Sequence, residues 1–586
     1  MERNKCALMF MIILMAISTL LHAQTDVPVS TKGKDFYLSF GNNYGKPSNL
    51  SSLQFQIKIV ATKATTVRFF YKNNTSLNST SIYPIPSAPG GSLVRTIKLT
   101  TGDQKAAIYS MDTPNDETPV GTKSLTSSKS LRIQSDDSIA VYVLNIYPQT
   151  ADATNVLPTH LLGTNYYHAS YKPADATHSD GYTVVATEDN TIVYENGVQK
   201  ATLNEGQVYA NYTQNTDMTG KHITSTKPIA YFVTNTGVHV PVGVSTSNGT
   251  ADCLFQQIPP VDMWGSRYLV PVTTQGKERV RVIATSANTH ITYTGGGALT
   301  SGSSPLNAGQ FMELEITTAS TVNGEYITSD KPVGVFSYLE GNRNLTPATT
   351  NGDPSISWIA PFDQASDRVT IAPFATADNN FTNNYAIVIT PTATKAQTTV
   401  FKNAATTGAS LSGGTTWKDN LNSGFSYYIM ELTGATASDY WTFANDAGLF
   451  VQSYGIGPQI SYYYLGGSAL YNLNTAFFVN DIHYQKIAGE SFCPDVAIRA
   501  ELKNLDNTNS GYLKWYIDGV EETSARDQLV WNKNNLTPGS HTIRMDVTNA
   551  AGTIQSVQTT ITVIQCSSGG DAPKLFPINP GIFFMK

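Results

Sequence analysis

The chain has few cysteines and few charged residues, and both shortages limit what it can be. Four cysteines occur in 586 residues, and one of them, Cys6, lies close to the start. So few cysteines cannot form a disulfide framework, so the fold must depend on apolar cores. Charged residues make up 14% of the chain, and the formal net charge is −6. Without a basic excess to follow phosphates, we expect no nucleic-acid partner.

Long apolar runs are missing after the first 23 residues. Within them, Arg3 and Lys5 precede the apolar residues 7–21, and Leu21-His22-Ala23 resembles a cleavage site. This pattern is typical of a secretory signal peptide. The run is shorter than the roughly 20 residues that span a bilayer. We therefore expect an exported protein, secreted or held at a cell surface, with no transmembrane segment after the signal peptide.

Motifs for catalysis and metal binding are missing as well. The sequence contains no HExxH, CxxC or GxSxG, no P-loop and no twelve-residue calcium loop. We predict no enzyme and no cofactor. Two alternatives stay open. The fold of a carbohydrate-active enzyme brings two distant carboxylates together, and calcium in the polar connections has Asp252, Asp262 and Asp353 as candidate ligands.

What the chain does contain is a repeated block. Residues 325–339 read EYITSDKPVGVFSYL, and related blocks occupy 221–233, 131–143 and, in a weaker copy, 440–452. Successive copies start about 90 to 115 residues apart. Each copy is a polar bend flanked by β-branched and aromatic residues, which is typical of a strand, and Pro at the bend suits a strand start or edge. The sequence therefore predicts four divergent β-repeats.

Other strand patterns recur in the same order within each repeat. The resulting all-β units cover about 33–145, 163–235, 264–340 and 365–455, within a repeat region of 24–484. Gly206, Gly309 and Gly424 keep one place in their units, which indicates a turn with positive φ. We expect β-sandwich-like packing of the units, with a propeller-like ring as the alternative.

The long connections between units are candidate binding faces. They cover 145–162, 234–263 and 340–364, and each ends in a segment with proline. Loops of this length in a compact domain are commonly functional. Farther along, Tyr462, Tyr463 and Tyr464 follow one another. Because neighbours on a strand face opposite sides, at least one of these rings should face solvent.

Residues 485–566 form a different module. A Trp-bearing strand runs into an Asp-Gly turn at 511–522, and two strands follow at 536–564, which is typical of an immunoglobulin-like sandwich. Cys493 opens this module and Cys566 closes it, so we expect a disulfide between them in an exported protein, with Cys253 left over. Residues 567–586 are a tail with apolar residues, for which docking, strand pairing, sorting and a disordered end all stay open.

The repeated Ile-Thr-Ser-Asp-Lys-Pro-Val-x-Val-Phe block, with its Pro-containing connection and Gly-x-x-Tyr strand, resembles the N-terminal domain of the IgG Fc-binding protein family. The match is best over 181–361, and residues 485–566 are similar to immunoglobulin-like or PKD-like modules that accompany this domain in bacterial exported members. The resemblance implies non-enzymatic binding or adhesion toward a host glycoprotein (immunoglobulin- or mucin-like) or a cell-surface component. It carries over no binding residue. A structural envelope or matrix component and a carbohydrate-active enzyme remain the alternatives.

Overall fold

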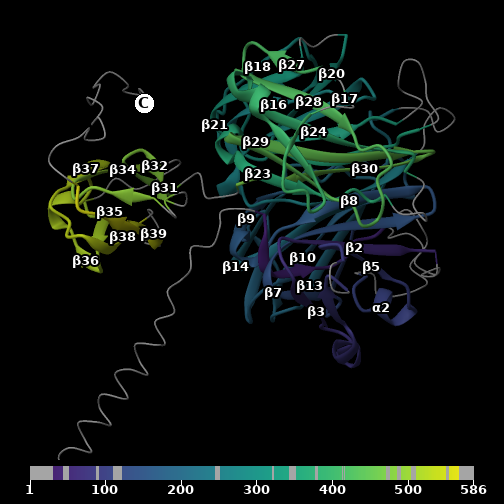
Figure 1. Ribbon diagram of the computed structural model, residues 1–586. Coiled ribbons are helices and arrows are strands. Elements are labelled where there is room, and N and C mark those ends of the chain that lie inside the picture. The colour runs from purple at the N-terminus through teal and green to yellow at the C-terminus, as the bar shows by residue number, and fades with distance from the viewer. Residues whose placement is uncertain are drawn as a thin grey trace, which may run out of the picture. The chain divides into compact units, whose positions relative to one another are not determined.

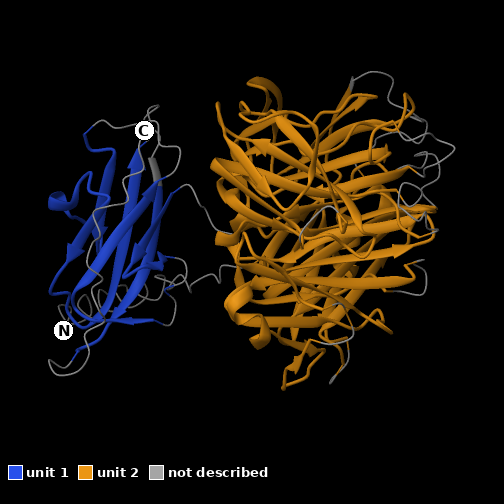
Figure 2. Ribbon diagram, turned by 90° about the horizontal axis from the view of Figure 1, so that it is seen from above, with its two compact units in different colours: residues 1–29, 474–586 blue, residues 30–473 orange. Residues whose placement is uncertain are grey.

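The computed structural model describes residues 31–43, 52–87, 91–109, 122–243, 251–319, 323–341, 351–375, 381–411, 414, 416–469, 475–484, 487, 490–502, 510–548 and 554–566 (Figure 1). The expected signal peptide and the tail lie outside these residues. The chain divides into a repeat region, Ser30–Leu473, and a C-terminal unit that starts at Asn474 (Figure 2). No helix in the described part is long and apolar enough to cross a membrane.

The all-β prediction is confirmed, and the repeated block forms one long, bent strand in each unit. In the first unit this is β7 (Leu131–Tyr147). Its first half pairs with β1 and β3, and its second half pairs with β2 and β8. Two sheets therefore share one strand, and we call them the first-half sheet and the second-half sheet. This arrangement gives each unit its sandwich-like packing.

The polar bend of the block is a bulge fixed by its own side chains. Ser225 Oγ donates to the carbonyl of Lys227 at 2.7 Å, and Ser329 Oγ donates to the carbonyl of Lys331 at 2.7 Å. Thr187 Oγ1 donates to the carbonyl of Pro228 at 2.6 Å. Proline has no N–H to place in the ladder, so it fits where the strand leaves one sheet for the other. The bend residues are thus explained by structure.

The strands of the four units repeat this plan. The first unit holds β1 (Gly33–Leu38), β2 (Gln54–Ala61), β3 (Thr65–Tyr71), β4 (Ile82–Ile85), β5 (Val94–Leu99), β7 and β8 (Thr150–Val156), with the short helix α2 (Gly102–Ala106). The second holds β9 (Gly163–Tyr167), β10 (Ser179–Ala186), β11 (Thr191–Glu195), β12 (Val198–Leu203), β13 (Val208–Gln214), β14 (His222–Val238) and β15 (Asp252–Gln257).

The third unit holds β16 (Gly265–Val270), β17 (Lys277–Ala284), β18 (Ile291–Thr294), β19 (Ala298–Ser301), β20 (Phe311–Thr317), β21 (Glu325–Leu339) and β22 (Ser355–Ile359). The fourth holds β23 (Ser366–Ile371), β24 (Asn383–Pro391), β25 (Thr399–Lys402), β26 (Ala409–Ser410), β27 (Lys418–Asn420), β28 (Phe425–Glu431), β29 (Trp441–Gly457) and β30 (Ile460–Gly467).

One strand crosses a predicted unit boundary. Strand β6 (Thr122–Ser127) lies within the span expected for the first unit, yet it pairs with β13 of the second unit along residues 208–213. The first unit therefore completes a sheet of its neighbour. The units are joined by strand pairing as well as by side-chain contacts.

The four last strands of the units meet at the centre of the repeat region. Strand β8 contacts β15 and β30, and β22 contacts the same two strands, so the four form a closed ring. Strands β8, β15 and β22 lie within the connections predicted as binding faces, and this prediction is wrong for them, because every residue of the four ring strands is buried. Within the same connections, 244–250 and 342–350 lie outside the described residues. Sandwich-like packing within units thus coexists with a ring between them.

The carboxylate of Asp152 lies at the centre of this ring and joins all four units. It accepts hydrogen bonds from the backbone N–H of Ala153, Phe255, Ile356 and Tyr463, at 2.9 to 3.3 Å. These four amides come from β8, β15, β22 and β30, one from each strand. Asp152 is fully buried, and this burial raises the pKa of its carboxyl well above the usual range, although the four amides act in the opposite direction.

The exposure predicted for the tyrosine run is wrong. Tyr462, Tyr463 and Tyr464 lie on β30 and are all 0% exposed. Because β30 is a strand of the central ring, protein covers both of its faces. Their hydroxyls are satisfied inside, since Tyr462 donates to Asn384 Oδ1 and Tyr463 donates to Gln452 Oε1.

The C-terminal unit is a two-sheet β-sandwich that begins earlier than predicted. One sheet contains β31 (Thr475–Val479), β32 (Ile482–His483), β34 (Val496–Leu502) and β37 (Val530–Lys533). The other contains β33 (Ser491–Phe492), β35 (Leu513–Ile517), β36 (Val520–Glu521), β38 (Gly539–Thr548) and β39 (Ile554–Val563). The boundary lies before Asn474 instead of after residue 484, because β31 pairs with β34.

The cysteines of the described residues fall into one pair and one free thiol. Cys493 follows β33 and Cys566 follows β39, and the two form a disulfide that encloses the sandwich. Cys253 is free and buried on β15 of the repeat region. Trp515 is fully buried in the sandwich core, where it packs against Phe477 and Trp531.

Candidate functional site

The second unit departs from its neighbours at three interior positions. Asn211 pairs with Tyr182, whereas the same positions of the first unit hold Ile97 and Ile57, and those of the third hold Leu314 and Val280. Glu195 lies opposite Ile223, where the other units place Phe69 opposite Ile133 and Tyr293 opposite Ile327. A facing set of apolar side chains has become polar in one unit of the repeat.

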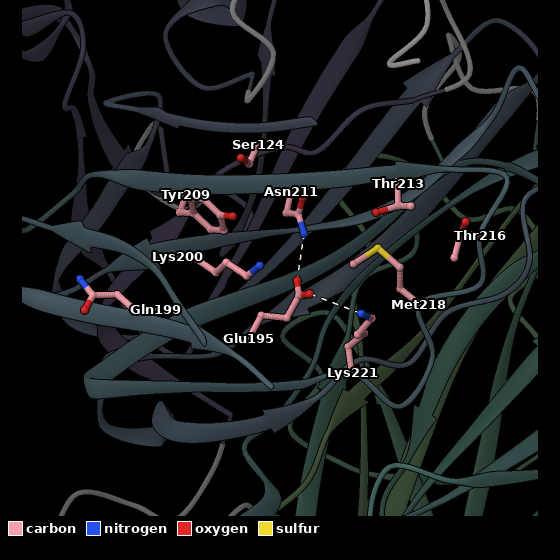
Figure 3. A pocket seen from close by; sticks show the side chains of 10 residues that line it. All are labelled: Ser124, Glu195, Gln199, Lys200, Tyr209, Asn211, Thr213, Thr216, Met218 and Lys221. Atoms are coloured by element: carbon pink, nitrogen blue, oxygen red, sulfur yellow. Dashed lines mark hydrogen bonds and ion pairs between the residues drawn. The ribbon is translucent and has the colours of Figure 1, made fainter. Parts of the chain in front are cut away.

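Glu195 and Asn211 line a cavity of about 380 Å³ between the two sheets of the second unit (Figure 3). One wall comes from the second-half sheet and the other from the β11–β12 hairpin, and the segment before β14 closes one end. The lining residues are Ser124, Glu195, Gln199, Lys200, Tyr209, Asn211, Thr213, Thr216, Met218 and Lys221. Its volume is in the range of small-ligand sites, roughly 300–1,000 Å³.

Glu195 is held as a carboxylate inside this cavity. It is 8% exposed. Its Oε2 accepts hydrogen bonds from Tyr182 Oη at 2.8 Å and from Asn211 Nδ2 at 2.9 Å, and its Oε1 lies 3.4 Å from Lys221 Nζ. Burial raises the pKa of a carboxyl, but these hydrogen bonds and the charges of Lys221 and Lys200 outweigh it and lower the pKa of Glu195. Glu195 therefore stays charged at neutral pH.

The oxygen of the Asn211 amide is not used inside the protein. Its Oδ1 atom has no hydrogen-bond partner among the protein atoms, and the residue lines the cavity. The first and third units have isoleucine and leucine at the same position. The polar cavity therefore sets the second unit apart and makes it the candidate site.

The aspartates predicted as calcium ligands do not form a metal site. Asp252 and Asp353 are fully buried, and Asp252 Oδ1 accepts from the backbone N–H of Ala151 and Cys253. Burial, with Asp353 and Asp152 nearby, raises the pKa of Asp252 well above its usual range. Asp262 lies on the short 3₁₀ turn Val261–Met263. Within the described ranges, no three His, Cys, Asp or Glu residues gather closely enough to hold a metal ion.

The carboxylate pair of a glycosidase is missing from the cavity. Glu195 is the single acidic residue among those that line it. Hydrolysis of a glycosidic bond ordinarily uses two carboxyl groups, one as acid and one as base or nucleophile. The acidic residues of the bends make local structural contacts outside the cavity. Asp136 forms an ion pair with Arg68 at 2.6 Å, for example, and Asp330 accepts from the N–H of His290. The cavity suits binding better than hydrolysis.

Comparison with known proteins places the chain in a family. A family model described as IgGFc binding protein matches residues 152–455, just over half of the chain. The chain belongs to the IgGFc-binding protein family. The human IgGFc-binding protein is 25% identical over 346 residues, which make up 56% of this chain and 6% of the human protein. The chain thus spans a small part of the length of this relative of the IgGFc-binding family.

Comparison with solved structures gives low scores. A Ca²⁺-stabilised adhesin that helps an Antarctic bacterium bind ice is 11% identical, with a TM-score of 0.11, over 73% of this chain and 94% of that one. The alpha-2-macroglobulin of E. coli is 10% identical, with a TM-score of 0.15, over 92% of this chain and 39% of that one. Scores this low support no argument about fold or function.

The residues of the cavity were not singled out from the sequence. Glu195 and Asn211 lie on strands that the repeat pattern does predict, but a single polar residue on a strand is ordinarily read as solvent-facing. The available signal was the comparison between units. Glu195 stands where its neighbours have aromatic rings, and Asn211 where they have aliphatic side chains.

Proposed function

We propose that this member of the IgGFc-binding family is an exported, non-enzymatic binding protein. It recognises an extracellular protein or glycoprotein, with immunoglobulin-like and mucin-like molecules as the first candidates. The second unit makes the contact through its cavity. The polar cavity carries this proposal, since it is built at interior positions where the neighbouring units are apolar. Family membership, the signal-like residues 1–23 and the absence of catalytic motifs from the sequence support it.

The test is a binding assay with the purified chain and a variant in which the cavity is filled. Immobilised immunoglobulin, mucin and mucin stripped of its glycans are the probes. The variant is the double substitution Glu195→Phe and Asn211→Leu, which gives the second unit residues found at these positions in the first and third. We expect saturable binding of the natural chain to at least one probe and loss of at least 90% of it in the filled variant.

A matched control carries the reverse change in the third unit. Leu314→Asn places an amide at the position equivalent to Asn211 and leaves the second unit untouched. This control should bind as the natural chain does, provided that its thermal transition shows it is folded. A folded natural chain that binds none of the probes contradicts the proposal and favours a structural envelope or matrix component.

A further inference from the structure

We propose that the cavity of the second unit takes a saccharide that carries a negative charge, as a carboxylate or a sulfate ester. This inference rests on the proposed binding function and narrows its ligand. Three observations support it: the balance of charge in the cavity, the range of its hydrogen-bonding groups, and its size.

The charges that line the cavity leave one positive charge over. Lys200 and Lys221 face a single carboxylate, that of Glu195. Tyr182, Asn211 and Lys221 already hold this carboxylate. Lys200, on the edge strand β12, is exposed and has no ion-pair partner among the described residues. An entering group is therefore attracted if it is anionic, and Lys200 is placed to meet it.

The remaining lining favours a ligand with many hydroxyl groups over a bare anion. Strand β13 presents Tyr209, Asn211 and Thr213 from one face, and Ser124 lies beside Asn211 on β6. Hydroxyl and amide groups both donate and accept, as sugar hydroxyls do. A site for an isolated sulfate needs mainly donors. The mixture here matches a saccharide.

The size of the cavity and its apolar part agree with this assignment. A volume of about 380 Å³ is far larger than a sulfate or phosphate ion needs. Met218 is 2% exposed and contributes the apolar atoms of the lining beside the polar ones. Sugar rings present C–H groups between their hydroxyls, so a soft thioether next to hydroxyl partners suits them.

The site is largely formed before a ligand arrives. Tyr209 and Asn211 lie on β13, which is hydrogen-bonded to β10 on one side and to β6 on the other. Glu195 ends β11, and its two oxygens are fixed by Tyr182, Asn211 and Lys221, which come from three other segments of the second unit. Figure 3 draws the contacts with Asn211 and Lys221. Side chains on paired strands lose little freedom when a ligand binds.

The experiment compares acidic and neutral sugars on the full chain. The probes are N-acetylneuraminic acid, glucuronic acid, galactose 6-sulfate, galactose and inorganic sulfate, measured by calorimetry at low and at physiological salt. We expect at least one acidic sugar to bind at least tenfold more tightly than galactose and inorganic sulfate. The carboxylate and sulfate arms show which anionic group is preferred. Binding should weaken as salt increases, because the attraction is between charges.

Charge variants locate the binding. Lys200→Gln and Lys221→Gln should each weaken the binding of the acidic sugar at least fivefold. Lys63→Gln, which removes an exposed lysine of the first unit, should leave it unchanged. Lys200 is exposed, so its variant folds as the natural chain does, and an unchanged thermal transition confirms this.

Three results overturn the inference. They are equal binding of galactose and the acidic sugars, binding of inorganic sulfate as tightly as galactose 6-sulfate, and affinities unaffected by either lysine change. If the natural chain still binds a glycoprotein in the first assay while these sugars fail, the proposed function stands and the acidic-sugar assignment falls. If neither assay shows binding, both fall.

Discussion

Replacing Lys58 by methionine should stabilise the protein at neutral pH and destabilise it at high pH. Lys58 lies on β2 with its side chain fully buried. Its ammonium group donates to the carbonyl oxygen of Pro373, across the joint between the first and fourth units, and lies 5.6 Å from the centre of the Phe374 ring. Burial lowers the pKa of Lys58 to about 7, although Asp439 acts in the opposite direction.

The magnitude follows from the two protonation states. The unfolded amine holds its proton up to about pH 10.5, and the folded amine releases it near pH 7. Between these values the unfolded chain binds more protons, so the free energy of unfolding rises with pH by about 1.4 kcal/mol per pH unit. Over the whole window this amounts to about 5 kcal/mol, and the full cost applies below pH 7.

Methionine removes the titrating group and keeps most of the apolar volume. It leaves the carbonyl of Pro373 without its donor, at a cost of roughly 1–3 kcal/mol. Lys58→Met should therefore raise the free energy of unfolding by about 2–4 kcal/mol at pH 7 and lower it by about 1–3 kcal/mol near pH 10.5. The difference between variant and natural chain changes sign inside the window.

Urea unfolding followed by tryptophan fluorescence, at pH 7, 8, 9 and 10, measures this difference. Lys63→Met is the control, since the Lys63 side chain is 68% exposed and its replacement removes no buried ammonium group. A difference that stays constant across the four pH values would refute the reasoning. It would show that the amine of Lys58 is hydrated and titrates normally in the folded protein.

Three further changes test other parts of the structure. Asp152→Ala removes the acceptor of four N–H groups from four strands. Urea unfolding should show that the free energy of unfolding falls by more than about 4 kcal/mol. The control Asp103→Ala, at an exposed residue, should leave it almost unchanged. Gly334→Ala brings a methyl group within 2.5 Å of the Trp264 ring. Calorimetry should show that the free energy of unfolding falls by about 1–3 kcal/mol. Gly102→Ala is the control, because Gly102 has open space around it and its replacement should leave stability unchanged. Replacing both Cys493 and Cys566 by serine opens a link across 73 residues and should destabilise the C-terminal unit by about 4 kcal/mol. The transition of the repeat region should then stay where it was; a shift of both transitions would contradict the assignment.

The long strands of the repeat were predictable because their signal is local. In β21 the apolar residues after Pro332 and the bend before it specify a strand with a bulge, whatever the rest of the chain does. The C-terminal sandwich was predictable on the same grounds, from Trp515 and the Asp-Gly turn at its hairpin. The start of this unit was predicted too late, because the sequence of β31 fits a strand of either unit. Only its pairing with β34 shows that it belongs to the C-terminal unit.

The central strands could not be predicted, since what buries them is far away in sequence. Residues 150–156 look like a polar loop, with Asp152 and Thr154 among small residues. Their polar atoms are satisfied by the second unit in particular, where Gln257 N–H and Gln256 Nε2 donate to Thr154 Oγ1. A polar residue whose partners belong to another repeat gives no periodic signal. The cavity was not predicted for a different reason. Its polar residues alternate along strands as solvent-facing residues do, so the sequence pattern places them on the surface.

The position of Asp152 sets a limit on how alike the four units can become. The equivalent positions of β15, β22 and β30 hold Leu254, Ser355 and Tyr462. Four amides converge on one carboxyl group, and four identical units would bring four buried carboxyl groups together, each of them carrying a desolvation cost. A perfectly symmetric ancestor or redesign would have to fill this space with something else, such as water or an inorganic anion. Divergence of the repeats is therefore a condition of closing the ring with the protein's own atoms.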